Sequence, residues 1–188
     1  MSDEVLEKLV KDYMQLRFPL AGFAWQGGEP TLMGVDFFKK AVELQREYGT
    51  PGQQVSNTLQ TNGVLLDNNW CRFFHENKFL LGISIDGPKE FHDIYRVDHS
   101  GSGTFDRIMR GIGNCKRHEV EFSALVLLNN VNVEQPGRLF DFLVGNDLTY
   151  LQFIPCVEMD PATGRVAETT ATITSATRRA AIQPTALA

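Results

Sequence analysis

Two adjacent glycines followed by a carboxylate offer the most direct chemistry in this sequence. Residues 23–26 form a short, mostly apolar run, and Gly27, Gly28 and Glu29 follow at once. Glycines leave the backbone bare, so a ligand can approach it closely. Glu29 adds one negative charge at the same place. The pattern predicts a cradle for a ligand that carries a positive group, although a Gly-Gly turn with a solvated Glu29 is the alternative for the tripeptide alone.

Polar or glycine-rich residues also end two later apolar runs. These endings are Gln60-Thr61-Asn62-Gly63 and Ser84-Ile85-Asp86-Gly87. In barrels and open parallel sheets alike, ligands bind at the carboxyl ends of strands. We therefore expect Gln26, Gln60 and Asn62 to face a cavity there and to help position a ligand.

Helical and strand patterns alternate along the chain, which favours an α/β fold. Helices are predicted at residues 2–16, 35–48, from 67 or 68 through 74, 104–117 and 134–144. Strands are predicted at residues 55–60, 80–85, 120–128 and 150–157, with a first strand ending at 26. Residues 89–103 are predicted to be mostly loop, with a helical turn near 91–95. Strands separated by such helices must be parallel, in a barrel or a doubly wound sheet.

The bulk composition is that of an ordinary globular protein. The chain has 188 residues, of which 43% are hydrophobic and 22% charged, with a formal net charge of −5. This size suggests one domain, and the negative charge argues against a nucleic-acid partner. No apolar run reaches membrane-spanning length, and the acidic N-terminus does not resemble a signal peptide. We therefore expect a cytoplasmic protein with no membrane partner.

The cysteines and histidines have no metal-ligand spacing. Cys71, Cys115 and Cys156 are far apart in the sequence, so each is interpreted as a small buried hydrophobe. The histidines are interpreted as surface residues: His75, His92, His99 and His118. No metal-binding residue is therefore predicted.

Taken together, three segments closely resemble the radical S-adenosylmethionine (SAM) enzymes, and most closely the anaerobic sulfatase-maturating enzymes. They are Phe23-Ala24-Trp25-Gln26-Gly27-Gly28-Glu29-Pro30-Thr31-Leu32, residues 57–63 and residues 82–88. Residues 105–107, 120–122 and 151–154 extend the resemblance, which covers about residues 1–158 in the family's order and spacing. The Ala- and Thr-rich residues 159–188 are predicted to be a disordered or weakly helical tail.

The resemblance implies an incomplete parallel (β/α)6 partial TIM barrel that binds SAM and a [4Fe-4S] cluster. In the family, the reduced cluster cleaves SAM to a 5′-deoxyadenosyl radical. That radical starts the oxidation of a Cys or Ser of a sulfatase peptide to formylglycine. The implied partners are therefore a sulfatase polypeptide and an electron donor such as ferredoxin or flavodoxin.

The family's SAM-binding positions can be carried over by motif. The second glycine, Gly28, lies against SAM, and its amino group would meet Glu29 and the carbonyls near Gly27 and Gly28. Arg96 in the Tyr95-Arg96-Val97-Asp98 segment would pair with the SAM carboxylate. Ser84 matches the ribose position, and the adenine would pack on a short apolar segment at Cys156 and Val157.

Structural roles remain as alternatives for three of these residues. Ser84 could satisfy a backbone group at a strand end. Arg96 could form a surface ion pair with Asp93 or Asp98. Asn62 could be a turn former.

The chain departs from the family at its cluster. The family's Cys-x-x-x-Cys-x-x-Cys loop would lie upstream of residue 2, and the three cysteines fall on two helices and a strand end, so they cannot replace it. The family's cysteine-rich C-terminal region and its catalytic aspartate are also not matched. No catalytic residue is therefore predicted, and the chain alone is expected to be inactive.

Three other functions remain open at this level. The chain could be part of another peptide-modifying radical SAM enzyme, or a non-catalytic remnant that binds SAM or a partner. An unrelated α/β-barrel lyase or aldolase would instead need a lysine or metal ligands at strand ends, and none of the predicted strand ends offers a lysine.

Overall fold

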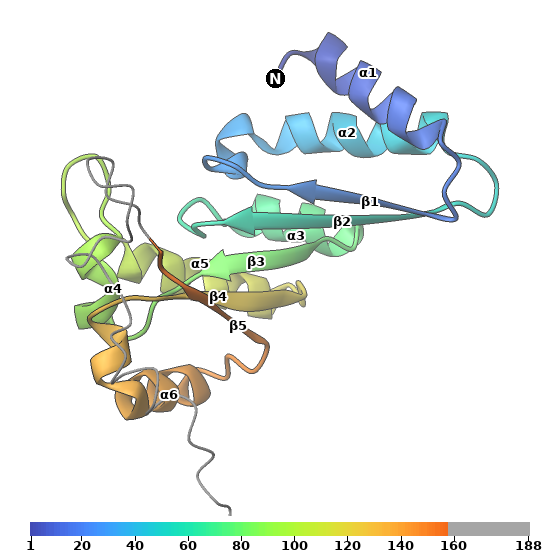
Figure 1. Ribbon diagram of the computed structural model, residues 1–188. Coiled ribbons are helices and arrows are strands. Elements are labelled where there is room, and N and C mark those ends of the chain that lie inside the picture. Colours follow the sequence, from blue (N-terminus) through green and yellow to red (C-terminus); the bar gives the residue numbers. More distant parts are fainter. Residues whose placement is uncertain (158–188) are drawn as a thin grey trace, which may run out of the picture. The chain divides into compact units, whose positions relative to one another are not determined.

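The computed structural model describes residues 1–157, in which parallel strands alternate with helices (Figure 1). These residues form two compact units. Unit 1 consists of Met1–Ile83 and Arg107–Ser123, and unit 2 of Ser84–Asp106 and the described residues from Ala124 onward. The tail predicted at residues 159–188 lies outside the described residues. None of the helices within residues 1–157 is both long and apolar enough to cross a bilayer.

Unit 1 is built on three strands. They pair in parallel, with Ala24 opposite Thr58 and Thr58 opposite Leu80. The strands are β1 (Leu20–Trp25), β2 (Gln54–Thr61) and β3 (Leu80–Ser84). The accompanying helices are α1 (Asp3–Met14), the 3-10 turn η1 (Pro30–Met33), α2 (Val35–Tyr48), α3 (Asn68–Glu76) and α5 (Phe105–Arg117). The predicted parallel arrangement is confirmed.

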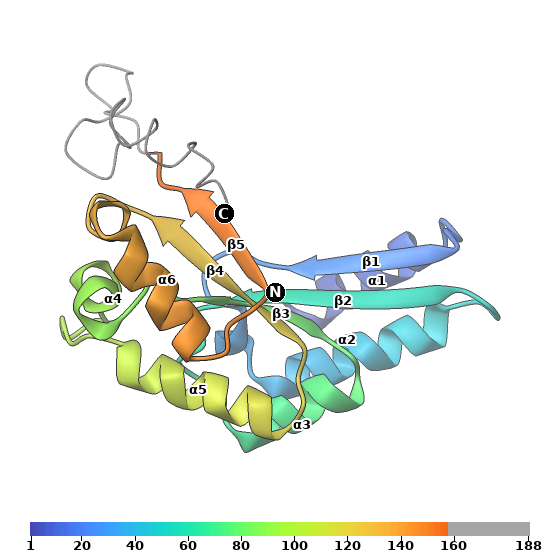
Figure 2. The same cartoon turned by 90° about the horizontal axis from the view of Figure 1, so that it is seen from below.

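The strands of unit 1 bury one face and leave the other open. Along β1, Ala21 and Phe23 are buried in a cluster with α1 and α2, whereas Gly22 and Ala24 are exposed. From Asn57 onward, strand β2 alternates in the same way, because a strand has a side-chain period of two. Figure 2 shows α2 and α3 on one side of these strands. The open face carries small and polar side chains: Gly22, Ala24, Ser56, Thr58 and Gln60.

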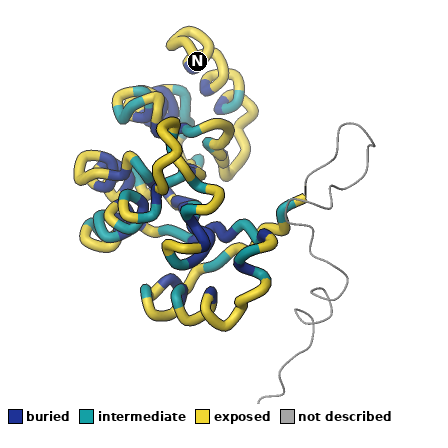
Figure 3. The backbone as a smooth tube through the Cα atoms, turned by 90° about the vertical axis from the view of Figure 1, so that its left-hand side faces the viewer, coloured by how far each residue is buried: buried dark blue, intermediate teal, exposed yellow. Residues whose placement is uncertain are grey.

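Unit 2 contains a second parallel pair. Strands β4 (Phe122–Leu128) and β5 (Leu151–Pro155) are in register with Val126 opposite Phe153. Its remaining elements are α4 (Lys89–Tyr95), the 3-10 turn η2 (Asn132–Glu134) and α6 (Pro136–Gly145). The core of this unit contains Ile85, Phe91, Val126, Leu139 and Leu143. In Figure 3, the buried residues are coloured dark blue.

Helix α4 bears on two predictions. The helical turn expected near residues 91–95 is present as a seven-residue helix, Lys89–Tyr95, which begins two residues earlier, and residues 96–103 contain no helix. His92, expected at the surface, lies on the inner side of this helix and is fully buried. The reason is tertiary: Phe91 packs into the core beside Gly87 and Leu139, which buries the face that also carries His92.

Candidate cofactor site

The turn after β1 presents bare backbone. Gly27 and Gly28 have φ angles of 105° and 58°, conformations that favour glycine. No heavy atom lies within 4 Å of the position that a Cβ would take at either residue. Neither glycine makes a backbone hydrogen bond to another described residue. Their carbonyls are therefore open to a ligand.

Glu29 is tied to two segments of unit 1. Its Oε1 accepts hydrogen bonds from Thr31 N at 3.1 Å, Thr31 Oγ1 at 2.5 Å and Thr61 Oγ1 at 2.7 Å. Its Oε2 accepts from Asn62 N at 2.7 Å. Thr31 lies in η1 and Thr61 ends β2, so the carboxylate joins the glycine turn to the next strand end. A carboxylate has about two lone-pair sites on each oxygen, so the three donors saturate Oε1, whereas Oε2 keeps one acceptor site.

The three amide side chains expected at the site have different surroundings. Asn62 Oδ1 accepts a hydrogen bond from Val64 N at 3.0 Å, which is the turn-forming role considered from the sequence. Its backbone N–H binds Glu29, so the structure brings Asn62 and Glu29 together. Gln26 and Gln60 are exposed. Their side chains make no hydrogen bond within residues 1–157 and are free to bind a ligand.

Arg96 is paired in a way that the sequence did not suggest. Its Nε donates to Asp86 Oδ2 at 2.5 Å, and its Nη2 donates to Asp86 Oδ1 at 3.2 Å. The Asp86 side chain is only 2% exposed, whereas that of Arg96 is 25% exposed. The ion pairs with Asp93 or Asp98 that were considered as alternatives are not formed. Asp86 belongs to the segment Ser84-Ile85-Asp86-Gly87, and its position directly after the predicted strand 80–85 was the only signal for it.

A buried polar network surrounds this ion pair within unit 2. Asp86 N donates to His92 Nδ1 at 3.2 Å, and His92 Nε2 lies 3.1 Å from Thr104 Oγ1. Thr104 Oγ1 donates to Arg96 O at 2.9 Å, and Asn132 Nδ2 donates to Asp86 O at 3.0 Å. Burial lowers the pKa of His92 to about 4, against the opposing charge of Asp86. The ring is therefore neutral at pH 7.

Two further predicted residues belong to unit 2. Ser84 is half-buried at the end of β3, and its hydroxyl makes no hydrogen bond to any described residue. The structural alternative for Ser84, a bond to a backbone group, is therefore not observed in this part of the chain. Val157 follows β5 and is 64% exposed. Both side chains are available to a ligand.

The cysteines do not form a cluster site. Cys71 on α3 and Cys115 on α5 are buried with their Sγ atoms 3.7 Å apart, and Cys156 follows β5. The hydrogen bond to Cys71, together with burial, raises the pKa of the Cys115 thiol, so it stays protonated. Within residues 1–157, no group of three or more His, Cys, Asp or Glu side chains could hold a metal ion. The described residues therefore do not fit a [4Fe-4S] cluster.

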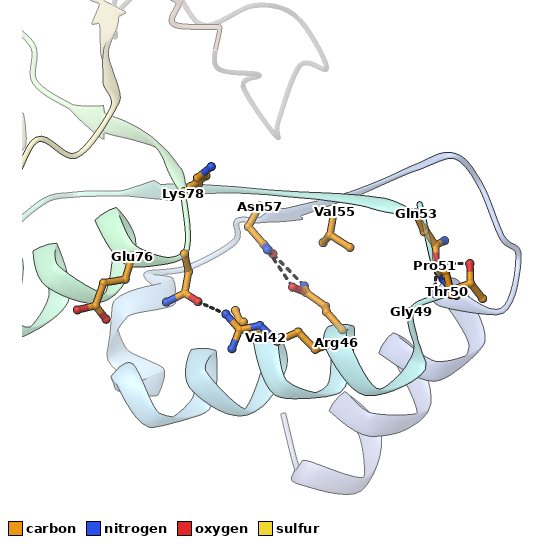
Figure 4. A pocket seen from close by; sticks show the side chains of 12 residues that line it. Val42, Arg46, Gly49, Thr50, Pro51, Gln53, Val55, Asn57, Glu76 and Lys78 are labelled. Carbon is orange, nitrogen blue, oxygen red and sulfur yellow. Dashed lines mark hydrogen bonds between the residues drawn. The ribbon is translucent and has the colours of Figure 1, made fainter.

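A pocket in unit 1 lies away from the predicted residues (Figure 4). It has a volume of about 560 Å³ and is bounded by the C-terminal half of α2 and the first half of β2. In its wall, the amides of Gln45 and Asn57 exchange two hydrogen bonds of 2.9 Å. None of the predicted site residues lines it. Because ligands of parallel sheets bind at the opposite, carboxyl ends of strands, we do not assign the cofactor to this pocket.

Comparison with known proteins identifies the family. The sequence model of the Radical SAM superfamily matches residues 1–143. A serine-type anaerobic sulfatase-maturating enzyme of Bacteroides thetaiotaomicron is 45% identical over 159 residues, which cover 84% of this chain and 38% of that protein. A cysteine-type anaerobic sulfatase-maturating enzyme of Clostridium perfringens is 41% identical over 158 residues, which cover 84% of this chain and 43% of that protein. The chain thus spans less than half the length of these relatives.

A comparison with solved structures points to the same family. Native anSMEcpe with bound AdoMet and Cp18Cys peptide matches with a TM-score of 0.82 and 38% identity, over 89% of this chain and 48% of that one. This match confirms the predicted α/β fold of the radical SAM type, and the sequence comparisons confirm the predicted resemblance. The chain belongs to the radical SAM superfamily, and its core closely matches the anaerobic sulfatase-maturating enzymes.

Proposed function

We propose that residues 1–158 are the SAM-binding core of an enzyme that oxidises a Cys or Ser side chain of a sulfatase peptide to formylglycine. The observation that carries this proposal is the open Gly27–Gly28 turn held by Glu29, in a chain 45% identical to a serine-type sulfatase-maturating enzyme. Related structures with bound AdoMet and peptide support it. The SAM cofactor fits the residues present, because the turn offers both bare acceptors and negative charge.

The glycine turn would hold the SAM amino group. An ammonium group needs hydrogen-bond acceptors, and the carbonyls of Gly27 and Gly28 have unused capacity. Glu29 would contribute its negative charge and the acceptor site that remains on Oε2, which accepts one protein hydrogen bond, from Asn62 N. Asn62, through its backbone bond to Glu29, would keep the strand end in place.

The other SAM-binding positions carried over from the family lie in unit 2. Arg96 is a cation with one free edge and suits the SAM carboxylate. The unpartnered hydroxyl of Ser84 suits a ribose hydroxyl, and exposed Val157, with Cys156, suits the adenine face. Gln26 and Gln60 would position SAM or the peptide from the ends of β1 and β2.

The chemistry that SAM supplies in this family is a carbon-centred radical that removes a hydrogen atom from the target side chain. The cluster on which that chemistry depends finds no ligand set within residues 1–157. This chain's own residues would therefore bind and orient SAM. The same proposal includes a sulfatase polypeptide as substrate, with ferredoxin or flavodoxin as the electron donor in the cytoplasm.

Calorimetric titration of the chain with SAM tests the proposal. Gly28→Ala places a methyl group where SAM would lie, and we expect its affinity to fall about tenfold or more, equivalent to about 1.4 kcal/mol. Gly52→Ala is the matched control, because Gly52 also has a positive φ angle (85°) and open space around it. No SAM binding by the unmodified chain, or equal losses in both variants, would overturn the proposal.

A peptide titration addresses the substrate. In the presence of SAM, a fluorescent sulfatase-derived peptide with Cys at the target position is compared with the same peptide carrying Ser. Binding of either peptide, weakened by Gln60→Ala, supports the sulfatase assignment. Binding that ignores the target residue and sequence context would favour another peptide-modifying enzyme of the superfamily.

A further inference from the structure

Asp86 connects several segments of unit 2. Its Oδ1 accepts a hydrogen bond from Leu127 N at 2.9 Å as well as from Arg96. Its carbonyl accepts from Asn132, and its N–H donates to His92. Asp86 therefore contacts β4, η2, α4 and Arg96, the residue that caps the C-terminus of α4. A buried carboxylate with so many fixed partners has a single orientation.

The Asp86 carboxylate also fixes the plane of the Arg96 guanidinium. Two parallel N–H···O bonds define that plane, which a single contact could not do. They use Nε and Nη2, whereas Nη1 donates to no described residue. Arg96 therefore presents one edge to Asp86 and has a free outer nitrogen. This outer nitrogen is consistent with the partial exposure of the Arg96 side chain.

The backbone of Arg96 is fixed by a second route, which runs through His92. Because Asp86 N–H donates to His92 Nδ1, the proton of the neutral ring must lie on Nε2. Nε2–H then donates to Thr104 Oγ1, whose own proton goes to Arg96 O. Thr104 N also donates to Arg96 O, at 3.1 Å. Every donor and acceptor in this circuit is compatible, and both ends of it meet at Asp86.

We propose that Asp86 and His92 are positioning residues, which hold Arg96 with its outer nitrogen aimed at the SAM carboxylate. This inference rests on the proposed function, because it assumes that Arg96 meets SAM. Asp86 partly cancels the charge of Arg96, so the arrangement favours a carboxylate in one orientation over a general attraction for anions. Asp86 and His92 do not touch the ligand and act only through Arg96.

The test compares SAM with decarboxylated SAM, which lacks the group that Arg96 would bind. We expect the unmodified full chain to prefer SAM about tenfold, the value of one charge-assisted contact. In Asp86→Asn, the preference should fall below about threefold. In Thr104→Val, which keeps the side-chain shape but loses the hydroxyl, it should fall partway, and Thr104→Ser should restore it. A merely structural role would weaken both ligands equally and leave their ratio unchanged, and that result would overturn the inference.

An NMR measurement separates this inference from the proposed function. We expect the Arg96 Nε–H proton to be protected from exchange at pH 7, and to lose protection in Asp86→Asn but not in Asp93→Asn. The His92 nitrogens should show a proton on Nε2 alone. If the unmodified chain binds neither ligand, the proposed function fails, and loss of Arg96 protection in Asp86→Asn still supports the positioning circuit. The inference is overturned if the Arg96 Nε–H proton is unprotected in the unmodified chain, or if it stays equally protected in Asp86→Asn. If Asp86→Asn does not fold, the SAM preference of Thr104→Val decides between the two outcomes.

Discussion

The Glu29 turn in unit 1 and the Arg96 circuit in unit 2 hold opposite charges by different means. Glu29 is held by short neutral donors, two of them on Thr31, only two residues away. Arg96 is held by a buried ion pair with Asp86 and by a histidine circuit. The first arrangement consists of neutral, partly buried hydrogen bonds that join two segments, and the second contains a buried carboxylate in an ion pair. Losing a partner should therefore cost less in unit 1 than in unit 2.

The largest effect is expected when the buried ion pair is broken. Arg96→Leu leaves the Asp86 carboxylate uncompensated in the core, which should lower the free energy of unfolding by about 3–5 kcal/mol. Urea unfolding measures it. Replacing Asp86 by Leu as well should recover most of the loss. Arg138→Leu is the control, because Arg138 and Glu90 form an exposed pair worth less than about 1 kcal/mol. Equal losses in Arg96→Leu and Arg138→Leu would remove the contrast between the two units.

The next largest effect is a pH dependence that His92 should give to the stability of unit 2. Burial lowers the pKa of His92 from 6.5 to about 4 in the folded chain. The unfolded chain therefore binds the proton first as the pH falls. Stability from the neutral ring is fully present above pH 6.5 and is lost between pH 6.5 and about 4.

Unfolding curves measured across this pH range test the prediction. The loss should be about 2–3 kcal/mol, because part of the full shift is screened where water reaches the Arg96 edge. His92→Asn should flatten this part of the profile. The exposed His99 provides the control, and His99→Asn should retain the slope. A flat profile in the unmodified chain would mean that His92 is not buried in its neutral form.

This contrast also explains what the sequence could predict. Glu29 and Arg96 were predicted as site residues because each lies in a motif, and the alternation of strands and helices indicated parallel strands ending in polar residues. The pairing of Arg96 with Asp86, and the burial of His92, depend on how α4 packs on the core. Such packing joins residues of four segments, and no local pattern encodes it. The turn role of Asn62, by contrast, was visible locally and is observed.

A smaller effect is expected when the Glu29 carboxylate is altered. Glu29→Gln keeps one oxygen for Thr31 and Thr61, but turns an amide N–H₂ toward the Asn62 N–H donor. One hydrogen bond is lost and one donor is left unpaired, which should cost about 2 kcal/mol in urea unfolding. Glu43→Gln is the matched control, since Glu43 is exposed on α2. A loss of unfolding free energy as large as that of Arg96→Leu would show that Glu29 contributes as much to stability as the Asp86–Arg96 pair.

The smallest effect on stability should come from Gly28→Ala. With a φ angle of 58°, an alanine there lies in the left-handed region, which costs about 1 kcal/mol. No atom within 4 Å would clash with its methyl group. Gly52→Ala should lower the free energy of unfolding in urea by about the same amount. Only Gly28→Ala should also weaken the binding of SAM. A large loss of stability in Gly28→Ala alone would mean that the glycine serves the fold. A small loss would separate SAM binding from stability in unit 1. The Asp86–Arg96 pair does not allow such a separation in unit 2, because Asp86, which orients the cation that we propose for SAM, is also buried in a network of hydrogen bonds that joins four segments.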